Sequence, residues 1–183
     1  MTSKDVYCID TSALIDLWQH YGPETHPGLW GRGSARGKLG ELIDAGRLIA
    51  PRQVYKEIQS YKGESGLKGW AKRNKRMFVQ TTRQEVLLVE QINATFPGLT
   101  DSMKETPDAD PFVVALASTK IRSQLPGTGP DYVVLTCERR GGAGKPRIPD
   151  ACDEYQIKCL CYPTALIDFF QQEGWQFWEA SQR

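Results

Sequence analysis

YCIDTSALIDLW, residues 7–18, joins a short apolar run to an amphipathic pattern. The apolar run predicts a buried strand that ends at Asp10. The pattern after it predicts a helix over 12–20, which Thr11 or Ser12 would cap. The apolar face of this helix is formed by Leu14, Leu17, Trp18 and Tyr21. Asp10 is therefore expected at the carboxyl end of a strand, where open α/β sheets hold their ligands, and a helix-capping side chain is the alternative.

Strand and helix patterns alternate along the rest of the chain, which indicates a parallel sheet flanked by helices. Further strands are expected at 47–51, 77–81, 131–136 and 157–162. Further helices are expected at 35–45, 51–61, 67–75, 83–96, 108–122 and 163–172, whereas 20–34 is expected to be a Gly/Pro loop. Trp175 and Trp178 are expected in the core, because large aromatic side chains are usually buried, and an exposed surface for a partner is the alternative. The 183 residues suffice for one domain, 1–183, built as a three-layer α/β/α sandwich with a mainly parallel central sheet.

The composition excludes several classes of protein. Apolar residues make up 40% and charged residues 25%, as in ordinary globular domains. No window approaches the ~20 apolar residues that span a bilayer, and no signal-peptide core is present, so we expect a cytoplasmic protein without a membrane partner. The cysteines are odd in number and form no C-x-x-C pair, and His20 and His26 lack ligand spacing. Neither a disulfide framework nor a zinc site is therefore expected.

Glu57 occupies an unusual place in the helix that Pro51 opens. The apolar face of this helix contains Val54, Ile58 and Tyr61, and Glu57 falls in the middle of that face. Its carboxylate is therefore expected to point inward, which is costly unless a cation meets it. A Lys or Arg side chain would serve as that cation, and so would a metal ion.

Two acids stand at the start of the apolar helix 108–122. Asp110 is followed by Pro111, the arrangement of an N-cap with proline at the first helical position. Capping by itself would explain Asp110, while a metal ligand is the alternative. Asp108 is close enough in sequence to share either role.

Glu138 follows the strand 131–136 as Asp10 follows the first strand. Thr136 is placed to orient Glu138 or a bound water. An exposed loop acid is the alternative explanation, because basic residues follow it directly. Asp150, in the phrase RIPDAC, is a further candidate as a ligand or as a helix cap.

Taken together, the acids predict a site for a divalent cation. Strand ends and helix N-termini gather at one edge of a parallel sheet, so these carboxylates should meet. Two carboxylates ~4 Å apart repel by about 4 kcal/mol at an effective dielectric near 20, which a divalent ion would offset. Oxygen ligands alone suit Mg²⁺ or Mn²⁺. We expect Asp10 and Asp110 as the main ligands, completed by Glu57 and Glu138 directly or through water. The expected supporting residues are Thr11, Ser12 and Thr136.

Positive charge is concentrated in two short stretches, although the formal net charge is only +1. Such patches can hold phosphate groups, whereas a solvated surface is the alternative. The first patch consists of Lys68, Lys72, Arg73, Lys75 and Arg76. The second patch consists of Arg139, Arg140, Lys145 and Arg147.

With these residues in place, the chain resembles the PIN-domain nucleases over nearly its whole length. The matching phrases, in chain order, are IDTSALID with Asp10, VYKE ending at Glu57, DPFVVALA opening at Asp110, and LTCE ending at Glu138. The fourth acid in that family is usually Asp or Asn, whereas this chain has glutamate. This departure keeps Asp150 open as the residue that completes the site.

The late phrase IPDAC, residues 148–152, is similar to a toxin-type bacterial PIN-like (VapC-like) branch whose genes often neighbour a helix-turn-helix antitoxin. The resemblance implies a PIN-like fold and a Mg²⁺- or Mn²⁺-dependent endoribonuclease that hydrolyses RNA phosphodiester bonds. It implies the toxin of a toxin–antitoxin pair, with the antitoxin protein as partner, and leaves a homodimer open. The alternative is a catalytically inactive PIN-like scaffold that binds RNA or a protein.

Other phosphate-handling motifs fail in this chain. A haloacid-dehalogenase phosphatase needs D-x-D-x-T, and Ser12 occupies the place of its second acid. A P-loop needs glycine where Arg139 stands and Ser or Thr where Pro146 stands. No G-x-G-x-x-G follows the first strand, which argues against a dinucleotide site.

Overall fold

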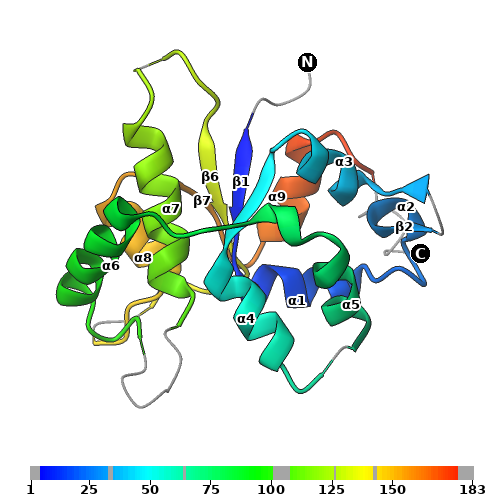
Figure 1. Ribbon diagram of the computed structural model, residues 1–183, viewed down its shortest axis with the longest axis horizontal. Helices are drawn as coiled ribbons and strands as arrows, with labels where there is room; N and C mark the ends of the chain where they lie inside the picture. The colour runs from blue at the N-terminus through cyan, green and yellow to red at the C-terminus, as the bar shows by residue number, and fades with distance from the viewer. Residues whose placement is uncertain are drawn as a thin grey trace.

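A parallel sheet forms the centre of the molecule (Figure 1). The computed structural model describes residues 5–32, 35–63, 65–100, 108–125, 127–141 and 144–176. Within these ranges the main sheet has five strands, every neighbouring pair parallel, in the order β5-β4-β1-β6-β7. The strands are β1 (Val6–Ile9), β4 (Leu48–Pro51), β5 (Phe78–Val79), β6 (Tyr132–Leu135) and β7 (Lys158–Leu160). The predicted parallel sheet is confirmed.

The central strand β1 is apolar and buried along its whole length. Tyr7 pairs with Leu48 on one side and with Val133 on the other, and all three side chains are buried. A strand covered on both faces needs a continuous apolar run rather than an alternating one. This requirement explains why VYCI, the β1 sequence, contains no charged residue.

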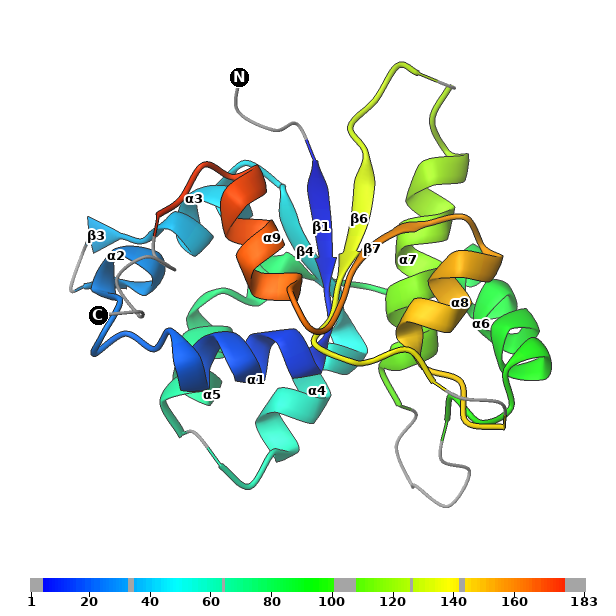
Figure 2. The same cartoon turned by 180° about the vertical axis from the view of Figure 1, so that it is seen from behind.

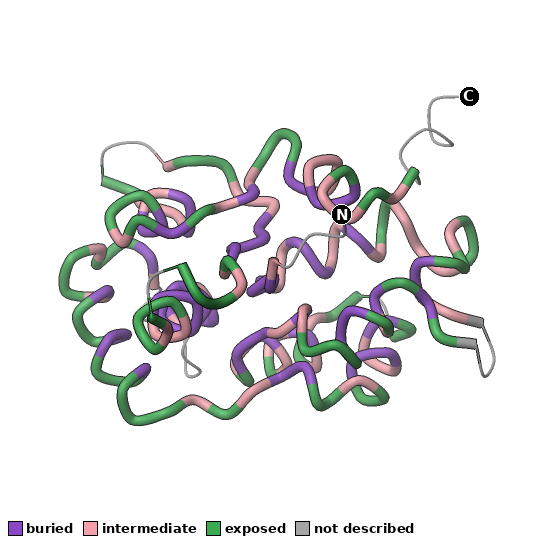
Figure 3. The backbone as a smooth tube through the Cα atoms, turned by 90° about the horizontal axis from the view of Figure 1, so that it is seen from above, coloured by how far each residue is buried: buried purple, intermediate pink, exposed green. Residues whose placement is uncertain are grey.

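Helices cover both faces of the sheet and complete three layers. Figures 1 and 2 show α6, α7 and α8 on one side and α3 and α9 on the other. In Figure 3 the buried segments gather in the middle, and exposed residues lie mostly on the outer helices. The helices are α1 (Thr11–His20), α2 (Pro27–Trp30), α3 (Lys38–Asp44), α4 (Arg52–Ser60), α5 (Ser65–Arg73), α6 (Arg83–Thr95), α7 (Asp110–Arg122), α8 (Ile148–Glu154) and α9 (Ala165–Gln172). The predicted α/β/α sandwich is therefore observed.

The segment 20–34 was expected to be a loop, and this expectation is wrong in part. It contains α2 and the strand β2 (Gly31–Arg32), which pairs antiparallel with β3 (Ala35–Arg36). Trp30 of α2 is buried, and its ring lies edge-on to the rings of Trp18 and Trp70. This tertiary aromatic contact overrides the turn-forming Gly and Pro residues around it.

The order of the strands creates a switch point between β1 and β6. From β1 the chain builds outward through β4 and β5, and then returns to add β6 and β7 on the opposite side. A crevice opens beyond the carboxyl ends of two strands whose connections leave in opposite directions. The residues that follow β1 and β6, Asp10 and Thr136, therefore stand beside each other.

Two remaining expectations concern the C-terminus and the membrane. Trp175 is half-buried and packs against Phe169 and Phe170, whereas Trp178 lies outside the described residues. None of the helices in the described ranges combines the length and apolar character needed to cross a membrane.

Candidate functional site

An open cavity of about 710 Å³ lies at the switch point. Five acidic residues from four segments of the chain line it, namely Asp10, Glu57, Asp108, Asp110 and Glu138. We call it the acidic cavity. Lys145 and Arg147 are the basic residues of its lining. The folded chain thus brings together the acids that the sequence analysis singled out, with the exception of Asp150.

Asp10 caps α1 and is buried, with only 2% of its surface exposed. Its Oδ1 accepts the backbone N–H of Ala13 at 2.7 Å, and its Oδ2 accepts the Thr136 hydroxyl at 2.8 Å. The prediction that Thr11 or Ser12 caps this helix is wrong. Extended backbone at Asp10 aims its carboxylate at the free N–H groups of the first turn, which leaves both hydroxyls for other partners.

The hydroxyls of Ser12 and Thr136 connect Asp10 to the end of β6. Ser12 donates to Asp10 at 2.8 Å and accepts the backbone N–H of Cys137 at 3.0 Å. Thr136 accepts the backbone N–H of Glu138 at 3.1 Å while it donates to Asp10. These bonds fix the two strand ends relative to each other and orient both acids.

Glu57 lines the acidic cavity, as the sequence predicts, and its hydrogen-bond partners come from α1 and from the start of α7. The Thr11 hydroxyl donates to Oε2, and the backbone N–H of Ala109 donates to Oε1 at 2.8 Å. Within the described ranges no Lys or Arg side chain pairs with it. The Thr11 hydroxyl and the Ala109 N–H at the start of α7 thus offset part of its charge.

Asp110 is the first residue of α7, and Ala109 is the N-cap, so the predicted capping role is wrong by one position. In the part of the chain that the structure describes, no hydrogen bond to the Asp110 carboxylate is present. Burial raises the pKa of Asp110 to about 8, reinforced by the charges of Glu138, Asp10, Glu57 and Asp108. The Asp110 carboxylate is therefore strongly repelled by the other acids of the cavity.

Burial also raises the pKa of Asp10, to about 7, although hydrogen bonds from Ala13, Thr136 and Ser12 lower it. The Glu138 charge adds to the rise. A buried carboxylate that keeps its proton near neutral pH is typical of sites where a cation or substrate completes the charge balance.

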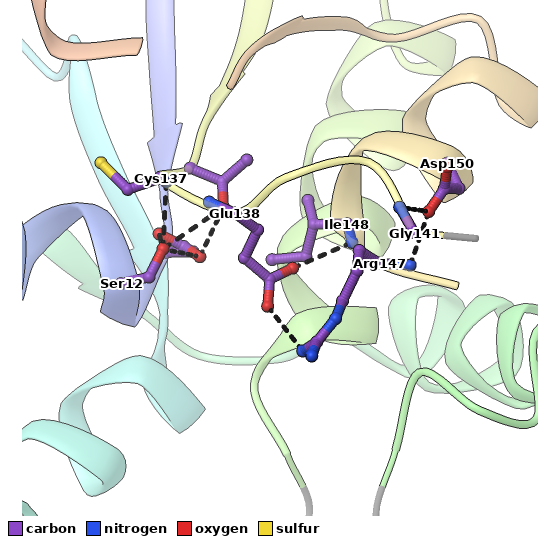
Figure 4. A network of polar contacts seen from close by, with 9 residues as sticks. Ser12, Cys137, Glu138, Gly141, Arg147, Ile148 and Asp150 are labelled. Carbon is purple, nitrogen blue, oxygen red and sulfur yellow. Dashed lines mark hydrogen bonds and ion pairs between the residues drawn. The ribbon is translucent and has the colours of Figure 1, made fainter. Parts of the chain in front are cut away.

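Glu138 and Asp150 have different positions at the start of α8 (Figure 4). Glu138 reaches the cavity and accepts Arg147 Nη1 at 3.2 Å and the Ile148 backbone N–H at 3.1 Å. Asp150 accepts the backbone N–H groups of Gly141 at 2.8 Å and Arg147 at 2.7 Å, and it does not line the acidic cavity. Of the two candidates, the structure places Glu138 in the site and leaves Asp150 as a cap.

The two basic patches are separated in space. Lys145 and Arg147 line the acidic cavity, Arg139 lies over the ring of Tyr162, and Arg140 pairs with Asp153. None of the first patch lines the acidic cavity. Its members lie on α5 and the 3₁₀ turn Lys75–Met77. Three of them, Arg73, Lys75 and Arg76, line another cavity of about 500 Å³.

The donor chemistry of the acidic cavity fits Mg²⁺ or Mn²⁺, because its acids offer hard oxygen ligands whose mutual repulsion a divalent ion would remove. The carboxylates are not, however, arranged as the ligands of a bound metal ion would be. Among the described residues, no three His, Cys, Asp or Glu side chains are grouped so as to hold an ion. Hydroxyl and N–H donors instead engage the oxygens of Asp10, Glu57 and Glu138.

Two backbone N–H donors of this site were not predicted from the sequence. The N–H groups of Ala109 and Ile148, at the starts of α7 and α8, hold Glu57 and Glu138. A usable signal existed, because Pro111 and Pro149 mark helix N-termini, and N-terminal N–H groups attract anions. The lining residues Gly98, Leu99 and Thr100 follow α6 and carried no such signal.

The fold and the site define a three-layer α/β/α protein with a cavity of carboxylates at the switch point of its sheet. Residues 7–177 match the family described as "Domain of unknown function (DUF4411)", and the chain belongs to this family. No curated protein and no solved structure matches the chain.

The raised pKa values of Asp10 and Asp110 predict a pH-dependent stability in EDTA. In the folded state both carboxyls bind a proton more tightly than in the unfolded chain, where their pKa is near the ordinary value of 3.8. The free energy of unfolding should therefore fall as the pH rises from about 4 toward 8, and level off above. We expect the melting temperature to drop by more than ~5 °C between pH 5 and pH 8, since a pKa shift of one unit corresponds to ~1.4 kcal/mol and 1 kcal/mol to ~2–4 °C in a chain of this size.

Scanning calorimetry at constant ionic strength measures this dependence, and Asp110→Asn should flatten it. A wild-type melting temperature that rises over the same interval would contradict the assignment of these two carboxyls.

Proposed function

We propose that this protein is a metal-dependent endoribonuclease that hydrolyses RNA phosphodiester bonds. One observation carries the proposal: five acidic side chains converge on one open cavity beyond the carboxyl ends of β1 and β6. That place in a parallel sheet is where ligands bind in open α/β folds. The resemblance of the four acidic phrases to PIN-domain nucleases supports the same activity.

The acids have distinct roles in this proposal. Asp10 and Asp110 would hold Mg²⁺ or Mn²⁺, with Glu57 and Glu138 completing the set directly or through water. Bound there, the ion would offset charge on a phosphodiester and make a nearby water more acidic. Thr11, Ser12 and Thr136 would keep the carboxylates oriented, as their hydrogen bonds to Glu57 and Asp10 support.

Positive side chains at the cavity would position the RNA backbone. Lys145 and Arg147 line the acidic cavity, where an incoming phosphate would need compensation for the surrounding carboxylates. Arg147 pairs with Glu138, and a phosphate would compete for this guanidinium. The basic segment on α5 would hold a more distant part of the strand.

The physiological role that we propose is that of a toxin restrained by an antitoxin. This part of the proposal depends on the resemblance of the IPDAC phrase to the toxin-type PIN-like branch. The expected partner is a helix-turn-helix protein that covers the acidic cavity or alters it. Co-purification with the product of a neighbouring gene, and loss of RNA cleavage in the complex, would test the pairing.

An inactive scaffold that binds RNA or a protein is the second candidate, and two observations favour it. Hydrogen bonds already engage three of the acids, and within the described ranges no ready metal group is present. In addition, Arg147 partly neutralises Glu138. Under this alternative the acids would act only as caps and as links between strands.

Metal binding separates the two functions. An ion present at 100 times its Kd stabilises a folded protein by ~2.7 kcal/mol, which corresponds to ~5–10 °C here. We expect such a rise in melting temperature when millimolar Mn²⁺ replaces EDTA, and its loss in Asp110→Asn.

Asp150→Asn is the matched control and should keep the Mn²⁺ shift, because Asp150 lies outside the acidic cavity. Cleavage of a labelled RNA is then measured in the same buffers. Absence of any shift in the wild type, with and without RNA, together with absence of cleavage, would favour the scaffold.

A further inference from the structure

A second cavity, of about 400 Å³, lies next to the acidic cavity and has no role in the proposed chemistry. Its lining includes Asp16, His20, Tyr21, Cys137, Tyr162 and Leu166, and we call it the aromatic cavity. Cys137 lines this cavity, whereas the following residue, Glu138, lines the acidic one. Figure 4 shows these two side chains pointing to different sides of the chain. The Cα atoms of these consecutive residues are ~3.8 Å apart, so the two cavities adjoin each other. We therefore expect one nucleotide to place its phosphate in one cavity and its base in the other.

Tyr162 provides a π surface beside this cavity. Its side chain is 47% exposed, and the Arg139 guanidinium lies 4.2 Å from the ring centroid. The Tyr162 backbone N–H donates to the carbonyl of Glu138 at 3.1 Å. The aromatic ring is thus attached to the same peptide segment that carries an acid of the other cavity.

Asp16 adds hydrogen-bond acceptors to the aromatic cavity. Its side chain lines the cavity together with Cys137 and Tyr162. A carboxylate has several acceptor positions, so Asp16 can accept hydrogen bonds from N–H donors on a ligand.

We propose that the aromatic cavity binds an unpaired nucleobase of the RNA strand whose phosphate lies in the acidic cavity. This inference rests on the proposed function. Unstacked bases bind proteins by stacking on aromatic rings and Arg planes, and by hydrogen bonds from their edges. Tyr162 and Arg139 supply the stacking surface, and Asp16 accepts from an N–H on the base. A base inside a duplex is stacked and paired, so we expect the site to favour single strands.

The test is the affinity for a fluorescein-labelled RNA single strand of ten mixed nucleotides, measured by fluorescence anisotropy in Ca²⁺, an ion that carboxylates bind and that offsets the charge of the acidic cavity. Tyr162→Leu keeps the apolar bulk but removes the π face, and Tyr162→Phe keeps the face. We expect the Kd to rise ~5–100-fold for Tyr162→Leu, since stacking on an aromatic contributes on this scale. Tyr162→Phe should bind like the wild type. Leu125→Ala is the control for an exposed apolar side chain in a different cavity.

Each outcome decides the inference. A wild-type affinity in a Tyr162→Leu protein with an unchanged melting temperature would overturn it, and so would a lack of RNA binding by the wild type. An equal loss of affinity for the annealed duplex would also overturn it, because the site should read unpaired bases only. If no variant cleaves RNA but the single strand binds in a Tyr162-dependent way, the nuclease proposal fails and the base site remains.

Discussion

Asp10→Asn should reduce RNA cleavage by ~10³-fold, which corresponds to ~4 kcal/mol of lost transition-state stabilisation. Asp10 stands at the switch point and shares the acidic cavity with Asp110, the acid whose charge is least compensated. The substitution removes one negative charge from the proposed metal ligands and replaces one carboxylate oxygen by an N–H donor. Single-turnover cleavage of a labelled RNA in Mn²⁺ measures the effect.

The fold should survive this substitution. The asparagine Oδ1 can still accept the Ala13 backbone N–H, so the cap of α1 remains. The new amide would donate to the hydroxyls of Ser12 and Thr136, which are able to reverse their roles. Because a buried charge disappears, the melting temperature in EDTA near neutral pH should not fall.

Asp150→Asn is the matched control for this experiment, since it alters an acid that caps α8 outside the cavity. Its cleavage rate should stay close to that of the wild type. If Asp10→Asn cleaves RNA at the wild-type rate after careful purification, its assignment as a metal ligand is wrong. If Asp150→Asn loses activity while Asp10→Asn keeps it, the site lies elsewhere.

Trp30→Ala should destabilise the protein by ~3–5 kcal/mol, the cost typical of removing a buried tryptophan. Trp30 is 6% exposed, and its ring centroid lies 4.8 Å from that of Trp18 and 5.0 Å from that of Trp70. Its indole N–H also donates to the carbonyl of Tyr21. The substitution therefore leaves a cavity where α1, α2 and α5 meet, together with an unpaired carbonyl.

Urea unfolding measures this change, with Trp30→Phe as the conservative comparison. Phenylalanine keeps most of the ring packing and loses the N–H donor, so we expect a cost of ~1–2 kcal/mol. If 20–34 were only a surface loop, Trp30→Ala would change the free energy of unfolding by less than ~0.5 kcal/mol. That result would contradict the packing described here.

Local signals in the sequence were sufficient for the five strands of the main sheet and for most of the helices, whereas α2 and α8 were not predicted. The apolar runs at β1 and β6 and the start signals of α7 predicted these elements at nearly their observed positions. Each pattern is strong because its element is buried on more than one side. The prediction of a loop at 20–34 was wrong in part for the opposite reason. Gly and Pro dominate this segment, and Trp70, which packs against Trp30, lies far away in the chain.

The candidate site divides in the same way. The inward orientation of Glu57 followed from helical periodicity, and Asp10 followed from its place after a strand. The partners of Glu57, a hydroxyl of α1 and the N-terminus of α7, come from distant segments that no spacing rule connects. The predicted cap of α7 at Asp110 was wrong by one position, because Ala109 is the observed N-cap and capping depends on backbone angles that neighbouring residues set.

By itself the sequence determined an alternating α/β chain and the identities of the acids that could form a site. The reason is that burial and periodicity depend on which residue types follow one another locally. Only the tertiary structure decided which acids share a cavity. Strand order placed Asp10 beside Thr136 and Glu138, while α8 turned Asp150 toward its own N-terminal N–H groups. The physical reason is that strand pairing and helix docking are long-range choices, whereas the signals read from a single sequence are local.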